Sequence, residues 1–232
     1  MRGQKDGVIT DLPGNYSLSP YTREEVVKRN YIMDERPDVV VNLVVASNIG
    51  RNLYLTTQLT EMGIPVLIAL NMMDIVKKNG DRIDTKKLSE QLGCEIIETS
   101  AVKGEGLKAL ADCAVKMARS GVKTTPQHTF DQRVEQALSE IASLISDVVP
   151  AESLRWYSVK LFERDEKAME SFSFAADTKE NLEQIIAGCE KQFDDDSESI
   201  ITNERYQDIG TLMQSCVHKK KSGMTTSDKI DQ

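Results

Sequence analysis

The sequence predicts an α/β domain built on a parallel sheet, followed by an all-α helical domain. Short runs rich in β-branched residues alternate with stretches of helical spacing, up to about residue 122. Two of these runs are too continuously apolar for a sheet with one face in water, which favours buried parallel strands. After residue 122 the strand signal fades and long amphipathic stretches follow. This change of character predicts a domain boundary near residue 122.

Four strands are predicted in the first part of the chain, with helices between them. The predicted strands are Val8–Thr10, Val39–Val45, Val66–Leu70 and Glu95–Thr99. Apolar residues at helical spacing precede Gly63, Gly93 and Gly121, and a glycine in that place is typical of a helix C-terminus. Alternation of strand and helix predicts right-handed crossovers, with helices on both faces of the sheet.

A helical domain is expected from residue 123 to residue 218, and a polar tail from 219 to 232. Apolar residues that recur every three or four positions predict three long helices, over 130–148, 182–193 and 209–217. Trp156 and Tyr157 are expected to pack between helices. The acidic run Asp194–Asp196 is expected to end a helix or to link two helices, because it lacks the glycine and distal glutamate of a calcium loop.

Composition and charge exclude several classes of protein. Of the 232 residues, 40% are hydrophobic and 28% are charged, which is typical of a globular protein rather than a disordered one. The net charge of -8 provides no basic field for nucleic acid. No apolar run approaches the roughly 20 residues of a membrane-spanning helix. The scattered cysteines are Cys94, Cys113, Cys189 and Cys216. We expect a soluble cytoplasmic chain with reduced core thiols and no nucleic-acid partner.

Three polar loops follow predicted strands and are expected to share one edge of the sheet. Asp11, Leu12, Pro13 and Gly14 follow the first strand, Asn71, Met72, Met73 and Asp74 the third, and Ser100, Ala101 and Val102 the fourth. Ligands of open parallel sheets bind outside the carboxyl ends of the strands. Each motif alone also fits an ordinary turn or helix cap. Their order at three successive strand ends predicts a nucleotide-binding site.

The residue types in these loops suit a guanine nucleotide with magnesium. A carboxylate directly after a strand can hold Mg²⁺ through water, and a glycine three residues later lets a backbone N–H approach a terminal phosphate, which fits Asp11 and Gly14. The Asp74 carboxylate can accept hydrogen bonds from the ring N–H and the amino group of guanine. Asn71 would contact the guanine ring and brace neighbouring loops, and the backbone N–H of Ala101 would donate to the guanine carbonyl. Met72 and Met73 either line the base pocket or fill the core.

Three further runs of sequence are distinctive: "DLPGNYSLSPYTREEVVKRNYI", "RNLYLTTQLTEMGIPVLIALNMMD" and "TSAVKGEGLKAL". They resemble the cytoplasmic G-protein module of the bacterial ferrous iron transport protein B family. The resemblance extends through "PQHTF", "RWYSVKLFERDEK" and "DDDSESIITNERY" to "TTSDKID", so it covers essentially the whole chain. It implies a partial P-loop-GTPase-like sheet with flanking helices, followed by the helical domain of that family.

The resemblance also implies a function. Family members bind GTP and GDP with Mg²⁺, and slow GTP hydrolysis gates Fe(II) uptake through a membrane-embedded permease region at the cytoplasmic face of the bacterial inner membrane. However, no Gly-Lys-Ser or Gly-Lys-Thr of a phosphate-binding loop occurs in the 232 residues. No general base is assigned, because Asn15 is shorter than the water-orienting glutamine that many small GTPases have there.

A second interpretation of the same sequence is therefore kept. The chain would be a stand-alone, non-catalytic interaction module, or a gene fragment, that has lost nucleotide hydrolysis. A parallel sheet that lacks one of its strands exposes unpaired backbone and apolar side chains. We accordingly expect the chain to self-associate.

Overall fold

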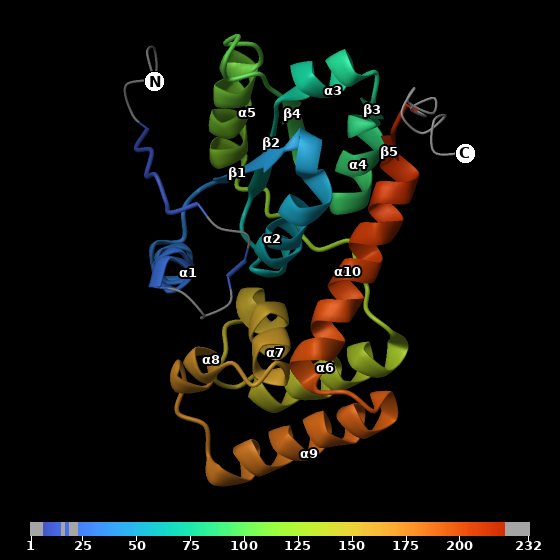
Figure 1. Ribbon diagram of the computed structural model, residues 1–232. Helices are drawn as coiled ribbons and strands as arrows, with labels where there is room; N and C mark the ends of the chain where they lie inside the picture. Colours follow the sequence, from blue (N-terminus) through green and yellow to red (C-terminus); the bar gives the residue numbers. More distant parts are fainter. Residues whose placement is uncertain (1–6, 15–16, 19–22, 221–232) are drawn as a thin grey trace, which may run out of the picture.

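A three-stranded parallel sheet organises the first half of the chain (Figure 1). In the computed structural model, which describes residues 7–14, 17–18 and 23–220, its strands are β1 (Val40–Val45), β2 (Val66–Asn71) and β4 (Glu95–Glu98). Their order is β1-β2-β4, and both pairs are parallel. The central strand β2 is almost wholly buried, as its continuous apolar run predicts. The three predicted strands in this part of the sequence are confirmed to within one residue.

The strand predicted at Val8–Thr10 is wrong. Residues 7–14 have no regular secondary structure, and the side chains of Val8 and Ile9 are 95% and 65% exposed. Within the described residues, no strand pairs with the outer side of β1. A short β-branched run without a partner strand gains no ladder hydrogen bonds, so its composition alone does not form a strand.

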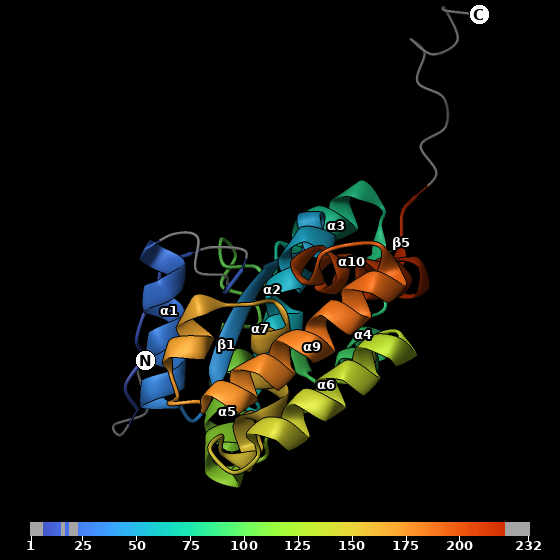
Figure 2. The ribbon, with the colours of Figure 1, turned by 90° about the horizontal axis from the view of Figure 1, so that it is seen from below.

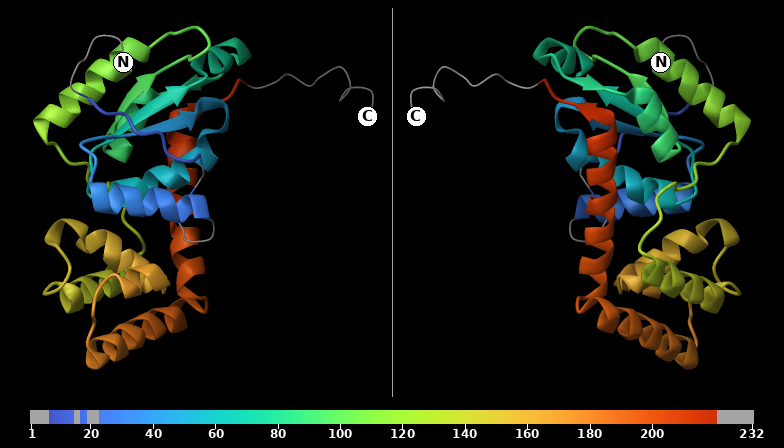
Figure 3. Two further views of the ribbon diagram at one scale, coloured as in Figure 1. Left: turned by 90° about the vertical axis from the view of Figure 1, so that its left-hand side faces the viewer. Right: turned by 90° about the vertical axis from the view of Figure 1, so that its right-hand side faces the viewer.

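Helices cover the two faces of the sheet unequally. The helices of this half are α1 (Arg23–Glu35), the 3₁₀ turn η1 (Ala46–Asn48), α2 (Ile49–Glu61), α3 (Met73–Asn79), α4 (Thr85–Leu92) and α5 (Leu107–Ser120). Figure 3 shows α2 and α5 on opposite sides of the sheet, as the alternation of strand and helix predicts. The Asn42 amide of β1 donates to Thr56 of α2, so Asn42 faces α2. Val41 and Leu43 point to the other face and are 45% and 61% exposed. The sheet is therefore open beside β1.

The second half of the chain is a helical layer against the lower end of the sheet. It comprises α6 (Gln132–Ile145), the 3₁₀ turn η2 (Ala151–Ser153), α7 (Leu154–Phe162), α8 (Glu166–Glu170), α9 (Ala176–Phe193) and α10 (Ser197–Cys216). Figure 2 shows α6 and α9 side by side, and Figure 3 shows α10 running from this layer up to the sheet. The three predicted helices are confirmed, although α10 begins well before the predicted 209. Helix α7 is buried almost all round, so it has no amphipathic pattern to predict it.

Several smaller predictions concern this half. Trp156 and Tyr157 are buried, as expected. Asp194 ends α9 in the left-handed region at φ 54°, and the Asp196 side chain caps α10 by accepting from the Ser199 N–H. The acidic run therefore separates two helices, and no metal-binding cluster of His, Cys, Asp or Glu occurs among the described residues. In the first half of the chain, burial raises the pKa of the Cys94 thiol to about 12.

None of the described helices is both long enough and apolar enough to cross a membrane.

A second, two-stranded sheet joins the two halves of the chain. Strand β3 (Arg82–Ile83) pairs antiparallel with β5 (Val217–His218), which directly follows α10. The sequence did not predict this pair, because two-residue strands carry no periodic pattern. The end of the helical layer is therefore attached to the segment that follows α3.

A buried ion network lies where α2, α7 and α10 meet. The Arg205 guanidinium donates to Glu61 Oε2 at 2.8 Å and to Glu163 Oε1 at 2.7 Å. Lys160 donates to the second oxygen of Glu163 at 2.6 Å, and His128 Nε2 lies 3.0 Å from Glu61 Oε1. All five side chains are at least nine-tenths buried. Charges buried to this extent are stable only when they are paired.

The network predicts how stability depends on pH. Burial alone raises the pKa of Glu61, but the Arg205 charge and the hydrogen bonds from His128 and Arg205 outweigh it and lower this pKa to about 2. A carboxyl group whose pKa is lower in the folded state stabilises the fold at pH values above its ordinary pKa of 4.5. This stabilisation is lost as the pH falls towards 2. We therefore expect the free energy of unfolding, measured with urea at several pH values, to fall between pH 5 and pH 2.

Glu61→Gln tests this source of pH dependence. The variant is expected to show a shallower decline over that pH range, because one titrating carboxyl group is gone. Glu170→Gln is the control, since Glu170 pairs with Lys167 at an exposed position. An unchanged acid slope in Glu61→Gln would contradict the assignment.

Candidate nucleotide-binding site

The first part of the candidate site is the turn that leads from β2 into α3. Strand β2 ends at Asn71, and Met72 takes the left-handed conformation at φ 65°, which redirects the chain into the helix. Met73 is buried and Met72 is partly exposed. Asp74 therefore lies in the first turn of α3, with its side chain 25% exposed. A carboxylate in this place is accessible to a ligand and is favoured by the helix N-terminus.

The second part is the loop after β4, and Asn71 joins it to the first. Asn71 Oδ1 accepts hydrogen bonds from the Ala101 N–H at 3.1 Å and from the Thr99 hydroxyl at 3.4 Å. The Met73 N–H donates to the Thr99 carbonyl at 3.4 Å, and the Thr99 N–H donates to the Leu70 carbonyl at 2.8 Å. The carboxyl ends of β2 and β4 are thus held together by side-chain and backbone hydrogen bonds.

The loop after β4 has a defined shape. Ser100 is buried and exchanges two backbone hydrogen bonds of 3.1 Å with Glu105, which closes a tight turn. Gly106 has φ 76°, and a Cβ there would lie 2.1 Å from the Glu98 carbonyl oxygen, so only glycine fits. At the tip, Val102 is 98% exposed and Lys103 Nζ lies 3.9 Å from Asp74 Oδ2. The tip of this loop therefore faces the same space as Asp74.

One predicted donor has a partner within the protein. The Ala101 N–H, expected to donate to the guanine carbonyl, donates to Asn71 in this structure. A base that uses this N–H has to share it with Asn71 or displace it.

The third predicted loop is placed apart from the other two. Asp11, Pro13 and Gly14 are exposed and Leu12 is half-buried. The Tyr31 hydroxyl of α1 donates to the neighbouring Thr10 hydroxyl at 2.8 Å. Figure 1 shows this dark blue segment on the outer side of β1. Asn15 lies outside the described residues. The structure therefore brings together the loops after β2 and β4, and leaves residues 11–14 at the open side of the sheet.

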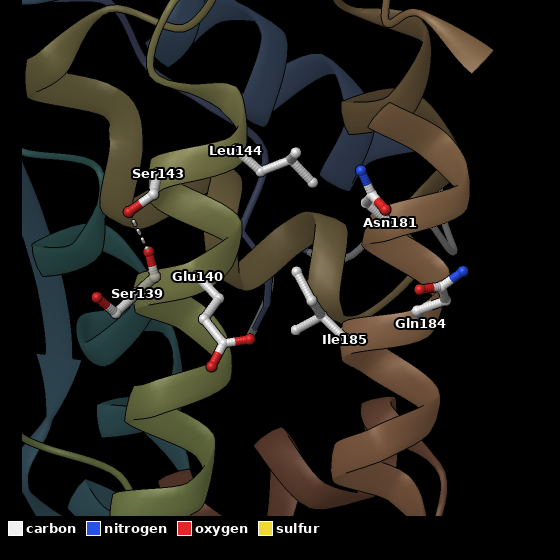
Figure 4. Close-up of a pocket in the computed structure, with 7 residues that line it drawn as sticks. All are labelled: Ser139, Glu140, Ser143, Leu144, Asn181, Gln184 and Ile185. Atoms are coloured by element: carbon white, nitrogen blue, oxygen red, sulfur yellow. Dashed lines mark hydrogen bonds between the residues drawn. The ribbon is translucent and has the colours of Figure 1, made fainter. Parts of the chain in front are cut away.

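A groove of about 550 Å³ lies in the helical layer, between α6 and α9. Its lining residues are Ser139, Glu140, Ser143, Leu144, Asn181, Gln184 and Ile185. Figure 4 shows Leu144 and Ile185 between the two helices, with the polar side chains around them and the Ser143 hydroxyl bonded to the Ser139 carbonyl. Glu140 is the one charged residue of this lining, and it is an acid. The groove is therefore poorly suited to a phosphate-bearing ligand.

A parallel sheet with flanking helices, two joined loops at its carboxyl edge and a helical layer below define the class of protein: a GTPase-type G domain followed by a helical domain. Residues 1–114 match the family model described as "Ferrous iron transport protein B", and residues 130–218 match the one described as "FeoB cytosolic helical domain". The chain belongs to the FeoB family.

Solved structures of S. thermophilus FeoB are similar to this chain. One is a GDP-bound mutant of the FeoB G-domain, with a TM-score of 0.86 and 41% identity, covering 89% of this chain and 80% of that one. Another is mGMPPNP-bound NFeoB, with a TM-score of 0.82 and 40% identity, covering 93% of this chain and 80% of that one.

Curated relatives are longer than this chain. It is 37% identical to an Fe(2+) transport protein A/Fe(2+) transporter FeoB fusion protein of Porphyromonas gingivalis, over 96% of this chain and 28% of the relative. It is 33% identical to the Fe(2+) transporter FeoB of Escherichia coli K12, over 96% of this chain and 29% of the relative. The chain therefore spans less than a third of the length of these relatives.

Proposed function

We propose that this chain is the guanine-nucleotide-binding module of a ferrous iron transporter, and that slow GTP hydrolysis regulates Fe(2+) uptake in the intact protein. The observation that carries the proposal is the pair of joined loops, with Asp74 on one and Ala101 on the other. The GDP-bound and mGMPPNP-bound structures of the S. thermophilus relative support the choice of ligand. Residues 1–122 form the partial G domain, 123–218 the helical domain and 219–232 the polar tail.

The base is read by the two joined loops. Asp74 accepts hydrogen bonds from the ring N–H and the amino group of guanine, once Lys103 yields the carboxylate to the base. Asn71 positions the loop of Ser100, Ala101 and Val102, so that the Ala101 N–H faces the guanine carbonyl. The side chains of Met72 and Met73 form the apolar wall beside the ring.

The phosphates and Mg²⁺ are assigned to the segment of Asp11, Leu12, Pro13 and Gly14. The Asp11 carboxylate is exposed, and a single carboxylate fits Mg²⁺ held through water, because this ion keeps several waters and takes its other ligands from phosphates. Gly14 has no side chain and open space around it, so its backbone can approach a terminal phosphate. Bound Mg²⁺ would neutralise charge on the phosphates during hydrolysis.

The partner of this module is a membrane-embedded iron permease region, which places the module at the cytoplasmic face of the inner membrane. The curated relatives support this assignment, since they are Fe(2+) transporters. Switch segments that rearrange with the nucleotide are the general means by which such modules act on a partner.

The test is to join the family's amino-terminal strand and phosphate-binding loop to this chain and to measure GDP binding by calorimetry. We expect a dissociation constant of about 1 µM or lower, and loss of binding with Asp74→Asn. No gain of binding in the joined protein would instead favour the non-catalytic interaction module, which the open side of β1 suits.

Self-association is expected at that open side. Val41 and Leu43 are exposed on the face of β1 opposite α2, and the outer edge of β1 has no partner strand among the described residues. We expect light scattering to show a concentration-dependent dimer. Leu43→Lys is expected to reduce it, because a charge on an edge strand opposes pairing, whereas Val148→Lys, at an exposed position of the helical layer, is not. A monomer at all concentrations would contradict this expectation.

A further inference from the structure

The two-stranded sheet of β3 and β5 attaches the end of α10 to the segment after α3. Its register pairs Arg82 with His218 and Ile83 with Val217. A further backbone hydrogen bond extends it, since the Asp84 N–H donates to the Cys216 carbonyl at 2.8 Å.

The attachment begins directly after the helix that carries Asp74. Helix α3 ends at Asn79, and Gly80 caps it in the left-handed region, with its N–H donated to the Lys77 carbonyl. The Asp81 N–H donates to the Val76 carbonyl of α3 at 3.1 Å, and the Asp81 carboxylate accepts from the Lys220 N–H at 2.8 Å. Asp81 thus contacts α3 through its backbone and the segment after β5 through its side chain.

Helix α3 depends on such attachments because it has only seven residues. A helix this short is not stable by itself, since few of its backbone groups are paired internally. Its N-terminal end is held by the Met73 N–H, which donates to the Thr99 carbonyl. Its C-terminal end is held by Asp81 and by the β3–β5 pair.

The end of α10 is itself fixed. Arg205, in the middle of the helix, is bound to Glu61 and Glu163 in the buried ion network. Near the C-terminus, the Ser215 hydroxyl donates to the Gln91 side chain of α4 at 2.9 Å, and Lys87 of α4 donates to the Ser215 carbonyl at 3.3 Å. Strand β5 therefore starts from a fixed point and can hold β3.

We propose that the β3–β5 pair and Asp81 are positioning elements that fix α3, and with it Asp74, for recognition of guanine, and that they couple the base site to the C-terminal end of α10. The recognition role rests on the proposed function. Coupling is reciprocal, so a base bound at Asp74 stabilises the β3–β5 pair to the same extent that the pair stabilises base binding.

The first test needs no nucleotide. Two shortened chains are compared, one ending after Cys216 and one ending after Lys220, so that only the first loses β5. Among the described residues Cys216 is the last that is buried, and circular dichroism checks that both chains fold. Amide hydrogen exchange in Ile75–Asn79 is expected to be about five- to tenfold faster without β5, and unchanged in α9. Equal exchange of α3 in both chains would overturn the proposal.

A point substitution gives the second test of positioning. Asp81→Ala removes the acceptor for the Lys220 N–H, whereas Asp81→Asn keeps a side-chain oxygen there. We expect faster exchange of α3 in Asp81→Ala and rescue in Asp81→Asn. Faster exchange in both variants would show that the charge of Asp81, rather than this hydrogen bond, matters, and would overturn its positioning role.

The recognition role is tested by comparing the affinity for GDP with the affinity for inosine diphosphate. Inosine diphosphate lacks the amino group that would donate a hydrogen bond to Asp74. The preference is expected to fall about fivefold in Asp81→Ala and to return in Asp81→Asn, in the protein joined to the phosphate-binding loop. An unchanged preference would overturn the recognition role. If no version binds GDP, the proposed function fails, and the exchange experiments still decide whether the β3–β5 pair fixes α3.

Discussion

Asp74→Asn is expected to weaken GDP binding by about 100-fold or more, with little effect on stability. The carboxylate can accept two hydrogen bonds from guanine, and bonds to an ionised acceptor contribute about 1.5–3 kcal/mol each. Asparagine offers one acceptor and one donor, so its NH₂ group faces a donor of the base. The side chain is partly exposed and holds no core residue in place, which is why the fold should tolerate the change.

The measurement is GDP affinity by calorimetry, in the chain joined to the phosphate-binding loop, beside thermal unfolding of each variant. Asp112→Asn, on the exposed side of α5, is the matched control for the loss of one negative charge. Xanthosine diphosphate carries a carbonyl in place of the amino group, so it is expected to bind Asp74→Asn better than the unaltered protein. GDP affinity within threefold of the unaltered protein would remove Asp74 from the site.

Arg205→Met is expected to destabilise the fold by about 3–5 kcal/mol, because it leaves the Glu61 and Glu163 carboxylates without their shared partner in a buried place. Methionine keeps much of the side-chain volume, so the loss measures the charge rather than a cavity. Urea unfolding at pH 7 gives the free energy directly.

Two variants isolate the cause of this loss. Arg36→Met removes an exposed ion pair with Glu152 and is expected to change stability by about 1 kcal/mol or less. Combining Glu61→Gln with Arg205→Met removes one of the two carboxylates that lose Arg205 as a partner and is expected to recover part of the loss. If Arg36→Met and Arg205→Met lowered the free energy of unfolding equally, burial of the ion network would contribute nothing to stability.

The sequence predicted the fold wherever a pattern repeats over several turns or fills a strand. The apolar run Val66–Leu70 and the helical spacing before Gly121 are examples, since burial of one face imposes a period on the sequence. Val8–Thr10 has the composition of a strand but pairs with no strand among the residues that the structure describes, and pairing is a property of the whole sheet. The seven-residue α3 and the almost wholly buried α7 are not predicted, because neither shows a one-sided apolar pattern.

Part of the candidate site can also be predicted from the sequence, because two of its motifs follow neighbouring strands. The motifs at Asn71–Asp74 and Ser100–Val102 follow strands that are adjacent in the sheet, so the sequence predicted their proximity. It could not predict that Asn71 takes up the Ala101 N–H, or that Lys103 lies beside Asp74, because these contacts depend on the path of one loop. The β3–β5 pair joins residues 82–83 to residues 217–218, and no local pattern encodes so distant a contact.

Helix α10 has a consequence for how the molecule unfolds. It packs in the helical layer at its start, binds α2 through Arg205 at its middle and reaches β3 at its end. Melting either half would leave the buried charges of the other half facing water on one side, and would free a strand at the far end. We therefore expect the described part of the chain to unfold as a single cooperative unit, with one heat-absorption peak in calorimetry instead of two.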